Sequence, residues 1–204
     1  MKKKIFISPI LNLNKYNELE YSFGENWNSL FKNNYSLFTF FSTNHQFILE
    51  HLLNCNGLII QGTGDISLIN SNKLNKIRDK FEKKIIKIGI KKKIPILCVC
   101  RGFQLFNNTF KGSLIKTSKH VGTEHKIFFK KNPYFKKKNI TVNSFHNYNI
   151  KKLSNILRPI AHSEDGNVEI AYGKKYKILC TMFHPERDFA EKNFMNKILL
   201  KFFL

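Results

Sequence analysis

Short runs of apolar residues, bounded by polar or turn residues, recur along this chain and predict β-strands. The expected strands cover residues 4–8, 36–41, 57–60, 95–99, 125–129, 140–143, 156–162, 168–172 and 178–183. Several of these runs show no polar alternation, which is typical of strands buried on both faces. A central sheet covered on two sides is therefore expected.

A second pattern, with apolar residues every three or four positions, predicts helices between the strands. The clearest helix covers 72–91, and two more are expected over 102–110 and 188–203. The apolar face of the first is formed by Leu74, Ile77, Phe81, Ile85 and Ile88. Strands that alternate with helices predict a mostly parallel α/β sheet, with ligands at the carboxyl ends of its strands. The strands between 125 and 172 are expected to form hairpins and to extend this sheet.

Length and composition predict one domain over residues 1–204, because no linker divides the chain. The four cysteines lie in or beside apolar runs and do not resemble a secreted disulfide framework. The apolar run after Met1 is too short for a signal peptide, and no run reaches the roughly 20 apolar residues of a membrane span. We therefore expect a cytoplasmic protein without a membrane partner.

The formal net charge of +21 changes this picture only in part. Lysine predominates and is scattered, and no zinc-finger, helix-turn-helix or RNA-binding motif accompanies it, so no nucleic-acid partner is expected. A positive field would instead steer a small anionic substrate to the protein. Oligomeric state stays open, with a homodimer as one option.

The first candidate for chemistry is Cys100, where the strand run 95–99 breaks and a helical pattern starts at Arg101. A thiol at this junction faces the free N–H groups of the new helix, whose partial positive charge favours the thiolate. A small buried cysteine without a chemical role is the alternative. The strand-to-helix turn favours a nucleophile.

The second candidate is the tripeptide His184-Pro185-Glu186, directly after the strand run 178–183. Residues two apart in an extended segment project to one side, so Glu186 can orient the imidazole of His184. A nucleophile, a base and an orienting carboxylate form a catalytic triad wherever they stand in the chain. We therefore predict that Cys100, His184 and Glu186 act together.

A third candidate is the loop Gln61-Gly62-Thr63-Gly64-Asp65, which follows an apolar strand. Its glycines allow the backbone to approach a ligand closely and to offer N–H groups to an oxyanion. The loop lacks the lysine and hydroxyl residue of a phosphate-binding loop and the spacing of a dinucleotide-binding loop. A plain turn is the alternative.

Taken together, these stretches resemble class I glutamine amidotransferases, and more closely their free-standing gamma-glutamyl hydrolase branch. The stretches in the family's order are GLIIQGTGD (57–65), RDKFE (78–82), IPILCVCRGFQLFNNTFKGSL (94–114), VNSFHNYNI (142–150), EDGNVEI (164–170) and MFHPERD (182–188). The chain departs from the family at Lys111 and Cys98, where glycine is usual, and is shorter than typical members. Neither departure removes a catalytic group.

The resemblance implies a flavodoxin-like sheet flanked by helices, with a small additional antiparallel sheet. It implies hydrolysis of a gamma-glutamyl amide by Cys100, His184 and Glu186, with no cofactor. Backbone N–H groups of Gly62 and Arg101 would form the oxyanion hole. Further residues would contact the gamma-glutamyl group or what it carries: Gln104, Asn143, Ser144, Phe145 and His146.

The leaving group is open at this stage. One similar set of short, basic enzymes from capsule gene clusters releases glutamate from gamma-glutamyl-CDP-amidate and forms cytidine diphosphoramidate, and a cytidine nucleotide conjugate suits a positive protein. The alternatives are a gamma-glutamyl-amine hydrolase and a glutaminase subunit that hands ammonia to a synthase. His120 and His125, with Cys98 and Cys100, lack zinc-ligand spacing, so no metal site is expected.

Overall fold

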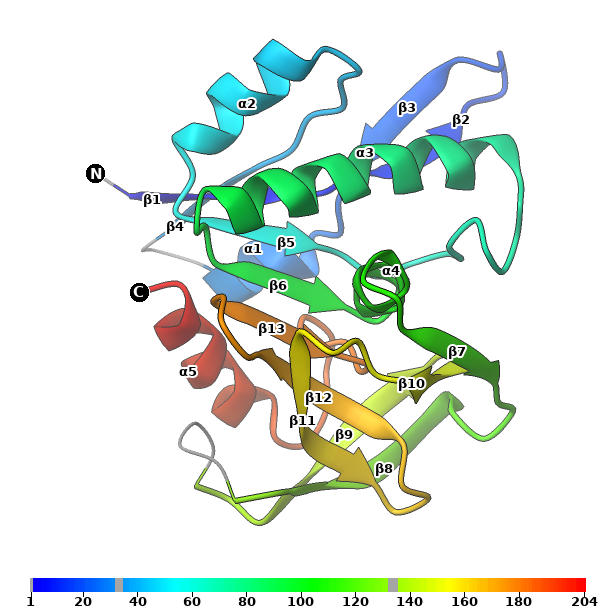
Figure 1. The fold of residues 1–204 in the computed structure, drawn as a ribbon, viewed down its shortest axis with the longest axis vertical. Helices are drawn as coiled ribbons and strands as arrows, with labels where there is room; N and C mark the ends of the chain where they lie inside the picture. The colour runs from blue at the N-terminus through cyan, green and yellow to red at the C-terminus, as the bar shows by residue number, and fades with distance from the viewer. Residues whose placement is uncertain (1, 32–34, 132–135) are drawn as a thin grey trace.

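A nine-stranded sheet forms the centre of the computed structural model, which describes residues 2–31, 35–131 and 136–204 (Figure 1). Five neighbouring strands are parallel, in the order β4 (Tyr35–Phe38), β1 (Lys3–Ile7), β5 (Gly57–Ile60), β6 (Ile96–Val99) and β13 (Ile178–Thr181). The sheet continues antiparallel through β12 (Val168–Gly173), β11 (Leu157–Ser163), β8 (Val121–Phe129) and β9 (Asn139–Phe145).

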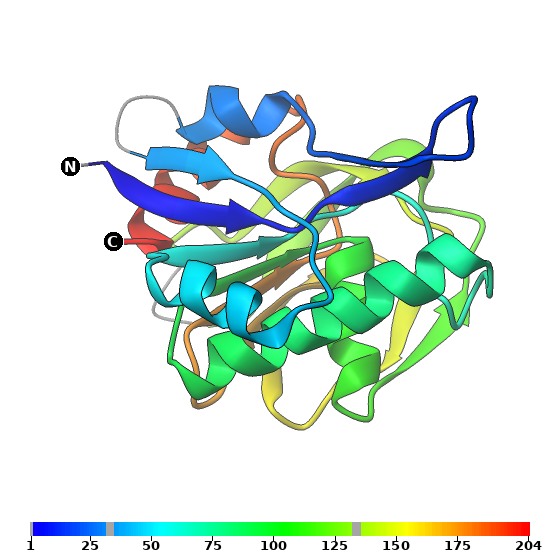
Figure 2. The ribbon, with the colours of Figure 1, turned by 90° about the horizontal axis from the view of Figure 1, so that it is seen from above.

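Helices cover both faces of the parallel half (Figure 2). One face carries α1 (Asn26–Phe31) and α5 (Lys192–Phe202), and the other carries α2 (His45–Leu53), α3 (Lys73–Lys91) and α4 (Arg101–Thr109). The strands are apolar throughout because each packs on both layers. In β1, for example, Ile5 and Ile7 belong to the core under α1 and α5, whereas Phe6 belongs to the core under α2 and α3.

Two small antiparallel sheets complete the fold. One pairs β2 (Ile10–Leu13) with β3 (Leu19–Ser22), and the other pairs β7 (Ser113–Lys116) with β10 (Tyr148–Lys152). No helix among the described residues is long and apolar enough to cross a membrane.

The predicted fold class is confirmed, and each of the nine predicted strands corresponds to a strand of the main sheet. The predicted last helix began too early, because residues 188–191 form turns before α5 begins at Lys192. The elements missed were β2, β3, β7, β10, α1 and α2. They are short, and α1 has only three buried residues with which to signal a period.

The sheet order brings the three candidate segments together. The loop at Gly62 follows β5, Cys100 follows β6, and His184 lies just beyond β13. These strands are neighbours and parallel, so the segments meet at one edge of the sheet, as expected for a ligand site.

Candidate active site

Cys100 occupies a sharp turn between β6 and α4, and its backbone lies at φ 48° and ψ −105°. A residue with a side chain rarely adopts this conformation, which costs about 1–3 kcal/mol. The surrounding chain imposes it, since the Cys100 N–H donates to the Thr181 carbonyl at 2.7 Å and the Gln104 N–H donates to the Cys100 carbonyl at 3.0 Å. The side chain of Cys100 is 7% exposed.

Gly102 explains how the turn can lie so close to the neighbouring strand. A Cβ atom at this position would lie 2.1 Å from the carbonyl oxygen of Ile60 in β5. Only glycine therefore permits the first turn of α4 to pack against β5. The same packing holds Cys100 at the edge of the sheet that carries the loop after β5.

His184 and Glu186 form the orienting pair expected from their spacing. The Nδ1 atom of His184 lies 2.6 Å from Oε1 of Glu186, and both side chains are buried. Burial lowers the pKa of His184, but hydrogen bonds with the Cys100 thiol and with the Glu186 carboxylate outweigh burial and raise the pKa to about 9. The three predicted triad members thus meet in one site.

Gly62 lies directly against the imidazole of His184. A Cβ atom at Gly62 would lie 2.5 Å from Cε1 of that ring, so a larger residue would displace the base. Thr63 and Gly64, which follow, both have positive φ values, 76° and 75°. The loop therefore turns sharply beside His184 and keeps its backbone close to the triad.

A buried network of four charged side chains, Arg78, Asp79, Glu82 and Arg101, supports this loop and the nucleophile turn. Arg101 donates to both carboxylates, and Arg78 donates to Glu82 at 2.9 Å. Two positive and two negative charges balance each other in the core, which lowers the penalty for burying them.

Both arginines also hold the loop by its carbonyl groups. Arg78 donates to the carbonyls of Gln61, Gly62 and Thr63 at 3.2, 3.1 and 2.8 Å. Arg101 donates from Nε to the Asp65 carbonyl at 3.0 Å. With the carbonyls turned to the arginines, the loop is fixed from the side opposite the triad. The side chain of Arg101 thus has a structural use that the sequence analysis missed.

Asn143 grips the main chain of His184 at two points. Its Nδ2 donates to the His184 carbonyl at 2.9 Å, and its Oδ1 accepts from the His184 N–H at 2.9 Å. Its observed polar contacts are thus to protein, which indicates that it positions the base. Its predicted contact with substrate stays a prediction.

The other predicted binding residues differ in how accessible they are. Phe145 is 44% exposed and packs edge to face with His184, at 6.0 Å between ring centroids. Gln104 and Ser144 are buried and donate to the carbonyls of Tyr148 and His120 at 3.1 and 2.8 Å. His146 is also buried. Phe145 is therefore the one of these four that presents a surface beside the triad.

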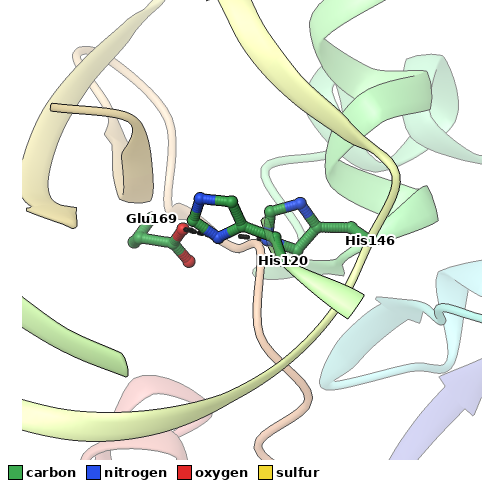
Figure 3. A group of neighbouring side chains, drawn as sticks. All are labelled: His120, His146 and Glu169. Atoms are coloured by element: carbon green, nitrogen blue, oxygen red, sulfur yellow. Dashed lines mark ion pairs between the residues drawn. The ribbon is translucent and has the colours of Figure 1, made fainter. Parts of the chain in front are cut away.

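A second polar cluster was missed in the sequence analysis. His120 and His146 converge on the carboxylate of Glu169 (Figure 3). The sequence analysis considered His120 with His125 and found no zinc spacing. The partners are far apart in the chain, so no local motif announces them, and only sheet pairing brings them together.

Comparison with known proteins agrees with this geometry. A family model described as Peptidase C26 matches residues 35–186. The gamma-glutamyl-CDP-amidate hydrolase of Campylobacter jejuni is 34% identical over 139 residues, which cover 68% of this chain and 65% of that protein. The chain thus spans slightly less than two thirds of that relative's length.

Solved structures share the fold over nearly the whole chain. A candidate GMP synthase protein from Thermoplasma acidophilum superimposes with a TM-score of 0.74 and 18% sequence identity, covering 100% of this chain and 93% of that one. A glutamine amidotransferase from Thermotoga maritima gives a TM-score of 0.69 and 14% identity, covering 98% and 82%. At these identities the likeness establishes the fold alone.

Proposed function

Because this chain belongs to the Peptidase C26 family, whose fold is that of the class I glutamine amidotransferases, we propose that it is a cysteine-dependent hydrolase of gamma-glutamyl amides. The observation that carries the proposal is the meeting of Cys100, on its strained turn, with the His184–Glu186 pair. A nucleophile bonded to a base, and a base bonded to an orienting carboxylate, is the arrangement that acyl transfer requires.

In the first half of the proposed reaction, the Cys100 sulfur attacks the δ-carbonyl carbon of the gamma-glutamyl group, and its proton passes to His184. The carbonyl oxygen becomes an oxyanion, for which the N–H groups of Gly62 and Arg101 are the proposed donors. The C–N bond then breaks, His184 gives its proton to the departing nitrogen, and a thioester remains on Cys100.

In the second half, water attacks the thioester carbonyl while His184 accepts a proton from it. The C–S bond breaks, glutamate leaves, and the proton returns to the Cys100 sulfur. The raised pKa of His184, about 9, favours the imidazolium form. An imidazolium beside the sulfur stabilises the thiolate before attack and supplies the proton that the leaving nitrogen needs.

We further propose gamma-glutamyl-CDP-amidate as the substrate, with cytidine diphosphoramidate and glutamate as products in the synthesis of capsule phosphoramidate. Two observations support this choice. The Campylobacter jejuni relative carries that activity in its name, and the matched region covers 68% of this chain. The net charge of +21 suits a substrate that carries a diphosphate.

The test is glutamate release by the purified chain, with gamma-glutamyl-CDP-amidate, L-glutamine and gamma-glutamyl amines compared at equal concentration. The proposal expects the highest kcat/KM for the nucleotide conjugate and no turnover by the Cys100→Ala variant. A preference for gamma-glutamyl amines would contradict the substrate and keep the chemistry. Turnover of glutamine only with an added synthase would replace the hydrolase by an ammonia-donating subunit.

A further inference from the structure

Three histidines surround one fully buried carboxylate at the antiparallel end of the main sheet. Glu169 lies in β12 and is 0% exposed. His125 lies in β8, His120 immediately precedes that strand, and His146 immediately follows β9. Because β9 pairs with β8 and β12 lies further across the sheet, the four side chains meet only in the folded protein.

The distances around Glu169 are those of ligands around one small ion. Its Oε1 atom lies 3.3 Å from Nε2 of His125, 3.7 Å from Nε2 of His146 and 3.8 Å from Nδ1 of His120. A tetrahedral zinc ion, with bonds of about 2.0–2.1 Å, separates its ligand atoms by about 3.3–3.4 Å. The ligand atoms of His120, His146 and Glu169 all lie within 4.8 Å of one another.

The facing atoms have no other use. Neither carboxylate oxygen of Glu169 receives a well-aligned hydrogen bond from any residue that the structure describes. The same holds for Nδ1 of His120 and Nε2 of His146. A buried carboxylate without partners costs several kcal/mol. A bound cation would remove this penalty.

Asp165 adds the outer contact that metal-binding histidines usually have. Its Oδ2 lies 2.9 Å from Nε2 of His120, so the proton of that ring belongs on Nε2 and the lone pair on Nδ1 points toward Glu169. Ser163 in turn donates to Asp165 at 2.5 Å. A carboxylate that fixes the tautomer in this way is the common second partner of a zinc-bound histidine.

Protons alone satisfy the cluster poorly. Burial lowers the pKa of His125, yet the Glu169 carboxylate beside it outweighs burial and raises the pKa above its usual range. Burial, and then the charges of His120 and His125, lower the pKa of His146 to about 3, so this ring stays neutral. One proton on His125 reaches Oε1 of Glu169 and leaves the lone pairs of the other two rings facing the carboxylate.

We propose that His120, His125, His146 and Glu169 bind a divalent transition-metal ion, with Zn²⁺ the best chemical fit. Imidazole and carboxylate ligands in a tetrahedral arrangement are typical of zinc. Four protein ligands leave no open position, so the ion is structural and takes no part in the chemistry at Cys100.

Such an ion would brace the base of the proposed triad. It would join β8, β9 and β12 at the point where the Glu169 carbonyl accepts from the Met182 N–H at 2.8 Å, two residues before His184. Asn143, which grips His184, lies three residues before His146 in the same segment. Metal binding would therefore stabilise the segments that hold His184 on both sides.

The test measures metal binding by the full chain carrying Cys100→Ser, which removes the reactive thiol as a competing ligand. After treatment with a chelator, Zn²⁺ and Co²⁺ are titrated back. We expect about one ion per chain, a rise in the melting temperature, and a Co²⁺ spectrum with tetrahedral d–d bands and without thiolate charge-transfer bands. Thiolate bands would place the ion at a cysteine and overturn the proposal.

Variants in the same background assign the site. Glu169→Gln should abolish the Co²⁺ bands, and Asp165→Asn should weaken Zn²⁺ binding about 10–100-fold through the outer contact. His162→Gln, on the same sheet but outside the cluster, should bind as before. Should Glu169→Gln fail to fold, Asp165→Asn decides the matter, since Asp165 is partly exposed. Unchanged binding by Asp165→Asn, or binding by the parent chain no tighter than by Glu169→Gln, would overturn the site.

Discussion

At the scale of single residues, Cys100 is under two separate demands, one chemical and one conformational. Replacing it with alanine removes the sulfur but keeps the side-chain carbon that makes φ 48° unfavourable. Both Cys100→Ala and Cys100→Gly should lose activity by about 10⁴-fold or more, as in other triad enzymes.

The two variants should differ in stability. Glycine relieves about 1–3 kcal/mol of backbone strain and loses about 0.5–1 kcal/mol through its greater freedom when unfolded. Cys100→Gly should therefore be more stable than Cys100→Ala by about 1 kcal/mol in urea unfolding. Equal stability would show that the turn is not strained. Cys98→Ala is the activity control, because burial, and then a hydrogen bond with Cys180, raise the pKa of Cys98 and keep it a neutral thiol.

Asn143 offers a test between positioning and binding. Its amide contacts the main chain of His184 at both ends, so Asn143→Ala should lower kcat about 10–100-fold and change KM little. A substrate contact would instead raise KM. Steady-state kinetics with the best substrate found separates the two outcomes, and circular dichroism checks that the variant is folded.

The His184–Glu186 pair makes stability depend on pH. The pKa of His184 rises from 6.5 to about 9 on folding, so its contribution is fully present below pH 6.5 and is lost as pH rises through about 9. Glu186→Gln removes one of the groups that raise this pKa. Wild type should therefore lose more stability than Glu186→Gln between pH 6.5 and 9 in thermal melts, by up to about 3 kcal/mol. Parallel melting curves would contradict this.

At the scale of elements, α3 does more than cover the sheet. Its buried Arg78, Asp79 and Glu82 reach the loop after β5 and the side chain at the start of α4. Two loops from neighbouring strands are thereby tied to one rigid helix, which keeps the backbone beside His184 and the turn at Cys100 in register.

Arg78→Lys tests this coupling, because lysine keeps the charge but lacks the planar fork that reaches three carbonyls. We expect kcat to fall about 10–100-fold, with a loss of about 2 kcal/mol in the free energy of unfolding. Lys87→Arg, exposed on the same helix, is the matched control and should behave as wild type. Wild-type kcat in Arg78→Lys would show that the loop needs no such support.

At the scale of the whole molecule, the excess of lysine predicts how the reaction responds to salt. With a net charge of +21, the protein should attract a diphosphate-bearing substrate more at low than at high ionic strength. The kcat/KM for gamma-glutamyl-CDP-amidate should fall about tenfold or more as salt rises. L-Glutamine, which carries no net charge, is the control and should respond little. Equal responses would exclude electrostatic steering.

The sequence by itself determined the class of fold and the candidate nucleophile, base and orienting carboxylate. These features are local: apolar runs of strand length signal a buried parallel sheet, and Cys100, His184 and Glu186 each stand where such a run ends. The parallel arrangement then places the ends of β5, β6 and β13 at one edge, without any knowledge of individual contacts.

Only the tertiary structure decided what the buried polar residues do. The side chain of Arg101 meets Asp79 and Glu82 from α3, Asn143 grips His184 from another strand, and Glu169 collects histidines from the far end of the sheet. These partners are tens of residues apart in the chain. Hydrogen bonds and ion pairs depend on distance in space, and apolar periodicity reports only which way a side chain faces, so their pairing could be seen only once the sheet was assembled.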